Sequence, residues 1–247
     1  MNDARPAGEF ALLEVRIGRK TFQAASGHSL EVLRDVAFAL KTGEVCGLVG
    51  PSGCGKTTML RSIAGLDRDY EGTLRRPPDG RIGMVFQEPR LLPWRTVLDN
   101  VRLVAPHIDE AELAALLETL GLAAHGAHYP GELSLGLARR VALARAFAVK
   151  PDLLLLDEPF VSLDDALARR LRDELALLVE DRAITTLLVT HDIDEAVRLA
   201  DRVVLLSPRP ARIVAELPIL TSRAGRTEDA MASIKAAIAA RLAAAQE

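Results

Sequence analysis

The chain has 247 residues, a length that suits one large domain or a core with a small insert. A hydrophobic content of 49%, an aromatic content of 4% and a formal net charge of −3 give no reason to expect nucleic acid as the main partner. No stretch reaches the roughly 18 consecutive apolar residues that span a bilayer, and residues 1–6 lack the apolar core of a signal peptide. We therefore expect a cytosolic protein that is soluble by itself.

Two strands are predicted near the N-terminus. Residues 12–17 alternate weakly between apolar and polar side chains. Residues 30–40 place Val36, Phe38 and Leu40 on one face at period two. A short turn then leads into an apolar third strand.

That third strand, residues 45–49, runs into a glycine-rich loop and a helix. The loop has the pattern G-x-x-x-x-G-K-[ST] and consists of Gly50, Pro51, Ser52, Gly53, Cys54, Gly55, Lys56, Thr57 and Thr58. In this strand–loop–helix context the pattern predicts a phosphate-binding loop, in which backbone amides and the helix dipole surround phosphate oxygens. Lys56 would neutralise the β- and γ-phosphates, and the Thr57 hydroxyl would ligate Mg²⁺.

The two cysteines, Cys46 and Cys54, form neither a metal-binding pattern nor a disulfide framework. A thiol at the N-terminus of a helix is expected to be more acidic than a free cysteine. Alkylation of Cys54 is therefore expected to block nucleotide binding, with MgATP slowing the reaction. The alternative is that Cys54 is an inert loop residue.

The next part of the chain is predicted to be polar, then extended, then irregular. Residues 66–81 are polar, and residues 82–86 predict a strand that ends at Gln87. Two prolines keep residues 88–95 out of regular structure.

Two helices are predicted after this segment. Residues 109–120 carry one leucine stripe, with Asp109 and Glu112 as a capping pair at the N-terminus. A second helix is expected from residue 134 to about residue 149.

The second half of the chain alternates strands with helices. Four consecutive leucines at 153–156 suit a central parallel strand that is buried on both faces. Further strands are predicted at 185–190 and 202–206, and helices at 165–180 and 192–199. This alternation predicts a mainly parallel, doubly wound α/β core.

The leucine strand ends in two adjacent carboxylates, Asp157 and Glu158. The carboxyl edge of such a sheet is where α/β proteins bind ligands. Asp157 would hold Mg²⁺, and Glu158 would polarise the water that attacks a phosphate.

The C-terminal residues 229–245 predict an alanine-rich helix. Its apolar stripe consists of Met231, Ile234, Ile238 and Leu242. Such a stripe usually packs on the protein's own core, and a contact with a dimer partner or a membrane subunit is the alternative.

Three more stretches follow these motifs in a fixed order. Residues 133–146 begin with Leu-Ser-Leu-Gly and precede the leucine strand, Ser162-Leu163-Asp164 follows it, and His191 ends the next strand. Together with the features above, they make residues 12–215 resemble the nucleotide-binding subunit of ABC transporters. Its cofactors would be ATP and Mg²⁺, and its activity would be ATP hydrolysis coupled to transport.

The resemblance implies a fold and a domain plan. The fold would be α/β of the P-loop NTPase class: a RecA-like, mainly parallel sheet with an N-terminal antiparallel β part and an inserted helical subdomain at about 88–150. The nucleotide-binding domain would span residues 10–220, and residues 221–247 would form a C-terminal helical extension.

The resemblance also assigns roles to particular side chains. Phe22 would stack on adenine, or alternatively it is a core phenylalanine. Glu158, His191 and Gln87 would form the catalytic set, with Gln87 sensing the γ-phosphate and His191 contacting it. The Mg²⁺ ligands would be Thr57, Gln87 and Asp157.

A homodimer is implied as well. Ser134 and Gly136 would reach the γ-phosphate bound by a second copy, and Asp164 would bridge the two sites. Leu135 departs from the Leu-Ser-Gly-Gly sequence that the family usually has. Because Ser134 and Gly136 are retained, we expect the contact across the dimer to survive.

Residues 86–101 look like those of the bacterial nitrate/sulfonate/taurine importer group. In this family the segment contacts the membrane permease, so Trp94 is a candidate contact, with packing under the helical insert as the alternative. The resemblance implies permease subunits as partners, a periplasmic solute-binding protein as an indirect partner, and a place on the cytoplasmic side of the bacterial inner membrane.

Three other functions are alternatives to the import of a small anionic solute of the nitrate, sulfonate or taurine kind. A subunit of a lipid or lipoprotein transporter would share the same motifs and is the main alternative. An ABC ATPase acting on nucleic acid or ribosomes would show tandem cassettes, a coiled-coil insertion or a basic surface. A P-loop kinase would leave residues 134–136 and 162–164 without a purpose.

Overall fold

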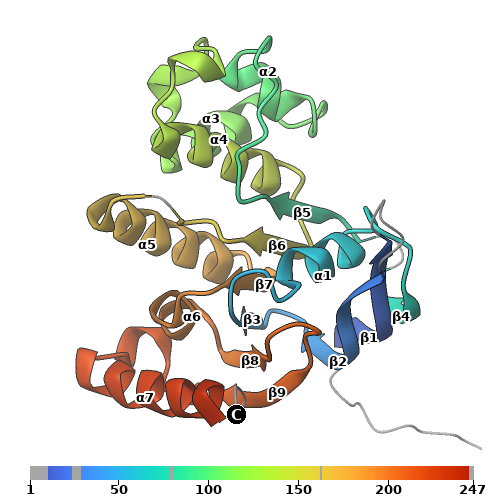
Figure 1. Cartoon of the computed structure of the whole chain (residues 1–247). Helices are drawn as coiled ribbons and strands as arrows, with labels where there is room; N and C mark the ends of the chain where they lie inside the picture. Colours follow the sequence, from blue (N-terminus) through green and yellow to red (C-terminus); the bar gives the residue numbers. More distant parts are fainter. Residues whose placement is uncertain (1–10, 24–28, 78–79, 162, 245–247) are drawn as a thin grey trace, which may run out of the picture.

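The computed structural model describes residues 11–23, 29–77, 80–161 and 163–244. Within them the strands form two sheets, shown in Figure 1. The smaller sheet is antiparallel, in the order β2-β1-β4, and consists of β1 (Ala11–Gln23), β2 (Ser29–Lys41) and β4 (Glu71–Arg75). The larger sheet has the order β5-β6-β7-β3-β8-β9 and consists of β3 (Val45–Val49), β5 (Ile82–Val85), β6 (Leu153–Asp157), β7 (Thr185–Thr190), β8 (Arg202–Leu206) and β9 (Ile213–Pro218). Only β9 is antiparallel to its neighbour in this sheet.

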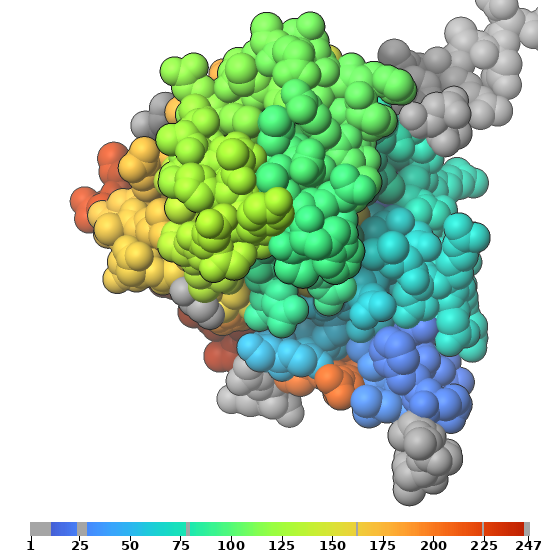
Figure 2. All heavy atoms as spheres, turned by 90° about the horizontal axis from the view of Figure 1, so that it is seen from above, coloured from blue at the N-terminus to red at the C-terminus, as the bar shows by residue number. Residues whose placement is uncertain are grey.

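The α-helices of the described residues are α1 (Lys56–Ile63), α2 (Val97–Arg102), α3 (Glu110–Thr119), α4 (Leu135–Ala148), α5 (Asp165–Asp181), α6 (Ile193–Leu199) and α7 (Glu228–Ala244). Short 3₁₀ turns lie at Ala123–His125, Pro130–Glu132 and Arg223–Gly225. Helices α2, α3 and α4 form a lobe beyond β5 in Figure 1. From above, in Figure 2, this green lobe stands beside the cyan and blue residues of α1 and the antiparallel sheet. None of the described helices is long and apolar enough to cross a membrane.

Strand β6 shows why the large sheet is buried on both faces. Leu153 and Leu155 pack with α1 and the antiparallel sheet, whereas Leu154 and Leu156 pack with α4, α5 and α6. All four side chains are at most 1% exposed. Successive residues of a strand point to opposite faces, so a strand between two layers needs apolar residues at every position. The predicted fold class, α/β with a mainly parallel sheet and an antiparallel β part, is confirmed.

The sequence prediction missed two strands. Strand β4 lies inside residues 66–81, which were predicted only as polar, and its side chains are mostly exposed. Strand β9 is an edge strand of mixed burial that pairs with β8. Strand β4 is mostly polar and therefore lacks the hydrophobic pattern on which strand prediction depends, whereas β9 has a short apolar run at residues 213–215 that the prediction passed over.

The predicted capping pair at α3 is half correct. Asp109 accepts hydrogen bonds from the backbone N–H groups of Ala111 and Glu112. The Glu112 carboxylate instead pairs with Lys150, at 2.7 Å, so it ties α3 to the end of α4.

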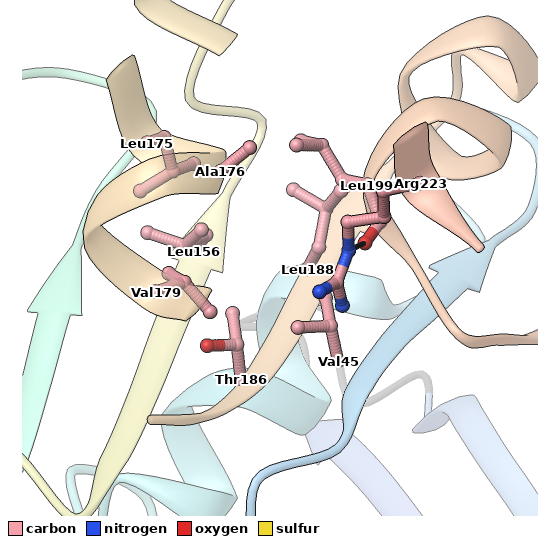
Figure 3. A pocket seen from close by; sticks show the side chains of 9 residues that line it. All are labelled: Val45, Leu156, Leu175, Ala176, Val179, Thr186, Leu188, Leu199 and Arg223. Carbon is pink, nitrogen blue, oxygen red and sulfur yellow. Dashed lines mark hydrogen bonds between the residues drawn. The ribbon is translucent and has the colours of Figure 1, made fainter. Parts of the chain in front are cut away.

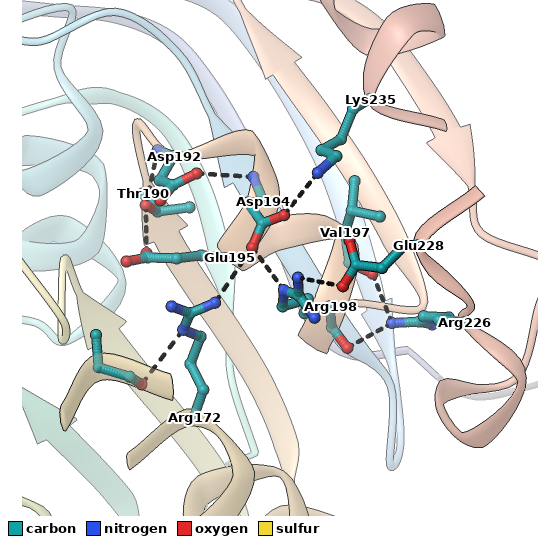
Figure 4. Close-up of polar contacts among 11 residues, drawn as sticks. Arg172, Thr190, Asp192, Asp194, Glu195, Val197, Arg198, Arg226, Glu228 and Lys235 are labelled. Atoms are coloured by element: carbon teal, nitrogen blue, oxygen red, sulfur yellow. Dashed lines mark hydrogen bonds and ion pairs between the residues drawn. The ribbon is translucent and has the colours of Figure 1, made fainter. Parts of the chain in front are cut away.

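Helix α7 packs on the protein's own core. Met231 is 1% exposed and Ile238 is fully buried, and both join the cluster formed by α4, α5 and α6. Figure 4 shows the polar side of this contact: the Asp194 carboxylate on α6 accepts hydrogen bonds from Arg172, Arg198 and Lys235, so it connects α5, α6 and α7. Core packing of the C-terminal stripe is therefore confirmed.

One apolar hollow lies inside the core between α5 and the sheet. Leu156, Leu175 and Val179 line one side of it, and Leu188 and Leu199 line the other (Figure 3). Arg223 closes it, while its guanidinium binds the Leu199 carbonyl and the Asp201 carboxylate. The lining of the hollow is thus mostly aliphatic, as expected of a packing feature.

Candidate functional site

The parallel register brings the predicted motifs to one edge of the large sheet. Val49 on β3 lies opposite Thr190 on β7, and Asp157 on β6 lies opposite Val189. The loop after β3, the carboxylates that end β6 and His191 after β7 therefore all leave the sheet at its carboxyl edge. This is the edge at which α/β proteins bind ligands.

The conformation of loop 50–58 depends on its glycines. Gly53 has φ of 74° and Gly55 has φ of 127°. A Cβ at Gly55 would lie 2.7 Å from Cγ1 of Val32, so no other residue fits there without a shift. The buried Lys56 donates hydrogen bonds to the carbonyls of Gly50 (2.8 Å) and Pro51 (3.0 Å), which holds its ammonium group over the loop.

An open cavity of about 780 Å³ lies over this loop. Its lining joins residues from β1, β2, the loop, α1 and the ends of β5, β6 and β8: Phe22, Leu30, Val32, Ser52, Gly53, Gly55, Lys56, Thr57, Thr58, Gln87, Glu158 and Arg209. Phe22 is 42% exposed, so the alternative that it is a core residue is wrong. The Lys20 ammonium lies 4.6 Å from the centre of the Phe22 ring, as in a cation–π pair.

Thr57 and Asp157 form a pair of oxygen ligands beside the cavity. The Thr57 hydroxyl donates a hydrogen bond to Oδ1 of Asp157, at 3.1 Å. Burial raises the pKa of Asp157 and the charge of Glu158 adds to the rise, whereas the Thr57 hydrogen bond and Lys56 act against it. A cation would restore the charged carboxylate. Mg²⁺ is usually held by one or two carboxylates together with phosphates and water, so this pair suits it.

Glu158 is held in an unusual backbone conformation. Its φ is 46°, in the left-handed region that costs a residue with a Cβ of the order of 1 kcal/mol or more. Its N–H donates to the Val189 carbonyl at 2.9 Å. Its two carboxylate oxygens lie 3.9 Å from the Lys56 ammonium and 3.2 Å from Nδ1 of His191. The carboxylate is thereby fixed between the loop and the next strand end.

The residues that are expected to act across a dimer, Ser134, Gly136 and Asp164, lie at the starts of two neighbouring helices. Ser134 is the N-cap of α4 and Asp164 is the N-cap of α5, and both side chains are exposed. A Cβ at Gly136 would lie 2.5 Å from Cδ2 of Leu167, so this glycine lets the two helices approach closely. None of these three residues lines the cavity over loop 50–58. Ser162, the first residue of the predicted Ser-Leu-Asp motif, lies outside the described residues.

Two apolar side chains of particular interest from the sequence, Trp94 and Leu135, are exposed. Trp94 is 71% exposed, so the alternative that it packs under the helical lobe is wrong. Leu135, which replaces the usual glycine, is 46% exposed at the start of α4 and does not enter the core.

The prediction for Cys54 is wrong in its direction. The thiol is 2% exposed, and burial raises its pKa although Lys56 acts against the rise. At a helix N-terminus the dipole favours a thiolate, but here the loss of solvent outweighs it. Burial raises the pKa of Cys46 still further, to about 12.

We accordingly expect Cys54 to react slowly with iodoacetamide at pH 7.5, at least about tenfold more slowly than the same cysteine in unfolded chain, because only the thiolate reacts. Because the pKa of Cys54 is raised, its rate of alkylation is expected to keep rising at pH values above those at which an ordinary thiol is already fully ionised. Peptide mapping by mass spectrometry separates Cys54 from Cys46. Equal rates in folded and unfolded protein would contradict this prediction.

Sequence reasoning missed Arg209 of the cavity lining, and it missed Lys20, which lies against Phe22 but is not part of that lining. Arg209 lies between two prolines in the turn from β8 to β9, and no motif marks it. Lys20 is 2% exposed on β1, where a register shift between Lys20 and Thr21 changes which residues face inward. The weak alternation of β1 was the only available signal, and it does not reveal a bulge.

The fold and this cavity define a P-loop nucleotide-binding protein. The ABC transporter family profile matches residues 33–161. The aliphatic sulfonates import ATP-binding protein SsuB 2 of Pseudomonas syringae pv. tomato is 44% identical over 226 residues, covering 91% of this chain and 95% of that protein. SsuB 1 of Pseudomonas aeruginosa (strain UCBPP-PA14) is 47% identical over 205 residues, covering 78% and 82%.

The solved structures agree with these relatives. The ATP-binding cassette MJ0796, described as a dimer in a post-hydrolysis state bound to ADP and Pi, has a TM-score of 0.72 and 30% identity and covers 83% of this chain and 98% of its own. The chain therefore belongs to the ABC transporter family, and it is an ATP-binding, ATP-hydrolysing subunit of that family. The roles of the individual site residues stay predictions.

Proposed function

We propose that this chain drives the import of a small anionic solute of the sulfonate kind through a membrane permease. The observation that carries the proposal is the identity of 44% to an aliphatic sulfonates import ATP-binding protein over 91% of the chain. Lipid or lipoprotein transport, the alternative drawn from the motifs alone, is not favoured by these relatives.

The proposed substrate of hydrolysis is ATP with Mg²⁺. Lys56 would bind the β- and γ-phosphates, and Thr57, Asp157 and Gln87 would hold Mg²⁺, which neutralises the charge that develops on the transferred phosphate. Glu158 would accept the proton of the attacking water, and its short distance to His191 supports a joint role at the γ-phosphate. Phe22 would stack on adenine.

Two copies are proposed to share two ATP molecules. Ser134 and Asp164 are exposed and do not line the chain's own cavity, which suits residues that act on a partner's nucleotide. An α4 N-terminus directed at a phosphate of the second copy would add its dipole to the site. The related cassette MJ0796 has a dimeric structure bound to ADP and Pi.

The remaining proposals concern the setting of the protein. Trp94, exposed on the helical lobe, would contact the permease on the cytoplasmic side of the bacterial inner membrane. A periplasmic solute-binding protein would deliver the cargo, and nucleic acid would take no part. The domain limits proposed from the sequence, 10–220 and 221–247 with a helical subdomain at about 88–150, are kept.

The proposal can be tested by capture and by transport. The Glu158→Gln variant, tagged and purified from membranes with MgATP, is expected to bring down an integral-membrane permease. Proteoliposomes that contain the wild-type complex and its binding protein should take up an alkanesulfonate only when ATP is present on the side of the membrane that carries this subunit.

The Trp94→Ala variant should no longer co-purify with the permease but should keep its ATPase activity. Leu220→Ala changes a residue that is 93% exposed outside the lobe, and this variant should keep both properties. ATP-dependent uptake of a lipid instead of a sulfonate would refute the proposal.

A further inference from the structure

Arg209 reaches the phosphate loop from a distant part of the chain. It lies in the turn between β8 and β9, and its guanidinium donates two hydrogen bonds to the Gly53 carbonyl, one of them from Nε at 3.1 Å. It also lines the same open cavity as Phe22 and Lys56. A residue 156 positions further along the chain therefore covers the middle of loop 50–58.

The turn that carries Arg209 is anchored on both sides. Ala211 donates to the Val32 carbonyl at 2.8 Å, and Arg34 donates to the Ala211 carbonyl at 3.0 Å. The Ser207 hydroxyl accepts from the backbone N–H of Arg212 at 3.0 Å. These bonds fix the turn against β2, so the position of Arg209 over the loop is set by the backbone.

Among the residues that the structure describes, no carboxylate neutralises the charge of Arg209. No carboxylate in the described ranges lies within ion-pair distance of its guanidinium, whereas the neighbouring Arg212 lies 4.0 Å from Asp35. A guanidinium is always charged and has five N–H donors, of which the Gly53 carbonyl engages two. The remaining donors are available in a cavity whose other cation, Lys56, already has Glu158 at 3.9 Å.

We propose that Arg209 is an additional nucleotide-binding residue, which contacts the polyphosphate of ATP while it holds the loop through Gly53. The inference rests on the proposed role of this cavity as the ATP site. A planar guanidinium suits phosphate oxygens, and an uncompensated cation beside the loop attracts the negative charge of the triphosphate. The contribution is therefore larger for nucleotides with two or three phosphates than for AMP.

The test measures affinities of the purified chain for a non-hydrolysable ATP analogue, ADP and AMP by isothermal titration. Arg209→Ala is expected to weaken binding of the ATP analogue and of ADP about tenfold, as expected for a charge-assisted hydrogen bond, and that of AMP by less than about threefold. Arg209→Gln can still donate to Gly53 but has no charge, so it is expected to show a similar loss. Arg209→Lys should recover part of it, and the matched control Arg212→Ala should bind like the wild type.

Four results would overturn the inference. Wild-type affinity of Arg209→Gln would show that the side chain only braces the loop. An equal loss for all three nucleotides would place Arg209 at the base or ribose. Unchanged nucleotide affinity in Arg209→Ala and Arg209→Gln, together with weaker binding by Lys56→Ala, would show that Arg209 does not belong to the site and would leave the proposed function intact. If Lys56→Ala also binds normally, the cavity is not the ATP site and the proposed function fails as well.

Discussion

Replacing Glu158 with glutamine is expected to lower the rate of ATP hydrolysis by roughly 10²–10⁴-fold, the usual contribution of a general base. Glutamine has the same length and shape, so the backbone at φ of 46° and the contact with His191 can be retained. It has no carboxylate to accept the proton of water. The rate constant at saturating MgATP, measured as phosphate release, gives the effect.

The affinity of Glu158→Gln for ATP is expected to stay the same or to increase, although its rate of hydrolysis falls. Glu158 places a negative charge 3.9 Å from Lys56, in the cavity that receives the triphosphate. Its removal should keep or increase the affinity for ATP, and Glu158→Gln should therefore accumulate as an ATP-bound dimer in size-exclusion chromatography. Glu118→Gln, which removes an exposed carboxylate from the helical lobe, is the matched control and should leave hydrolysis unchanged. Hydrolysis by Glu158→Gln within about threefold of the wild-type rate would show that another group is the base.

The elements that could be predicted from the sequence are those whose residue pattern is specific to one structure. The leucines of β6 are apolar at every position because both faces of the strand are covered, and the loop 50–58 has the residue types and spacing of a phosphate-binding loop. The order of the motifs then places Asp157, Glu158 and His191 at one sheet edge, and the register confirms that placement.

What could not be predicted depends on contacts between distant segments. Arg209 contacts Gly53 because the β8–β9 turn is anchored on β2, and no sequence pattern at either residue predicts this contact. Cys54 shows the same limitation: the helix N-terminus can be read locally, but the burial that raises the pKa of its thiol comes from a core cluster assembled from distant strands. Local chemistry and tertiary burial act in opposite directions there, and burial prevails.

The largest predicted effect on stability concerns Lys20. Its side chain is 1% exposed, its ammonium lies 2.9 Å from Oδ1 of Asp67 and 3.3 Å from Oδ2 of Asp69, and it also donates to the Asp69 carbonyl. These bonds fasten β1 to the segment after α1. Lys20→Met keeps the apolar stem but leaves Asp67 without its cation. We expect it to lower the free energy of unfolding by about 2–4 kcal/mol. This loss is somewhat smaller than that for a pair in which both side chains are buried, because Asp67 is 17% exposed.

Urea unfolding at equilibrium measures this change, provided that the slope of the transition is unchanged. Removing both charges, in Lys20→Met combined with Asp67→Asn, should recover about half of the loss because no buried charge is then left unpaired. Arg19→Met is the control on the same strand: Arg19 is 53% exposed and lies 3.6 Å from Glu31, so the change should cost less than about 1 kcal/mol. Because the Lys20 ammonium also lies against Phe22, Lys20→Met should in addition weaken nucleotide binding. A Lys20→Met protein as stable as Arg19→Met would show that the ion pairs do not hold β1 in place.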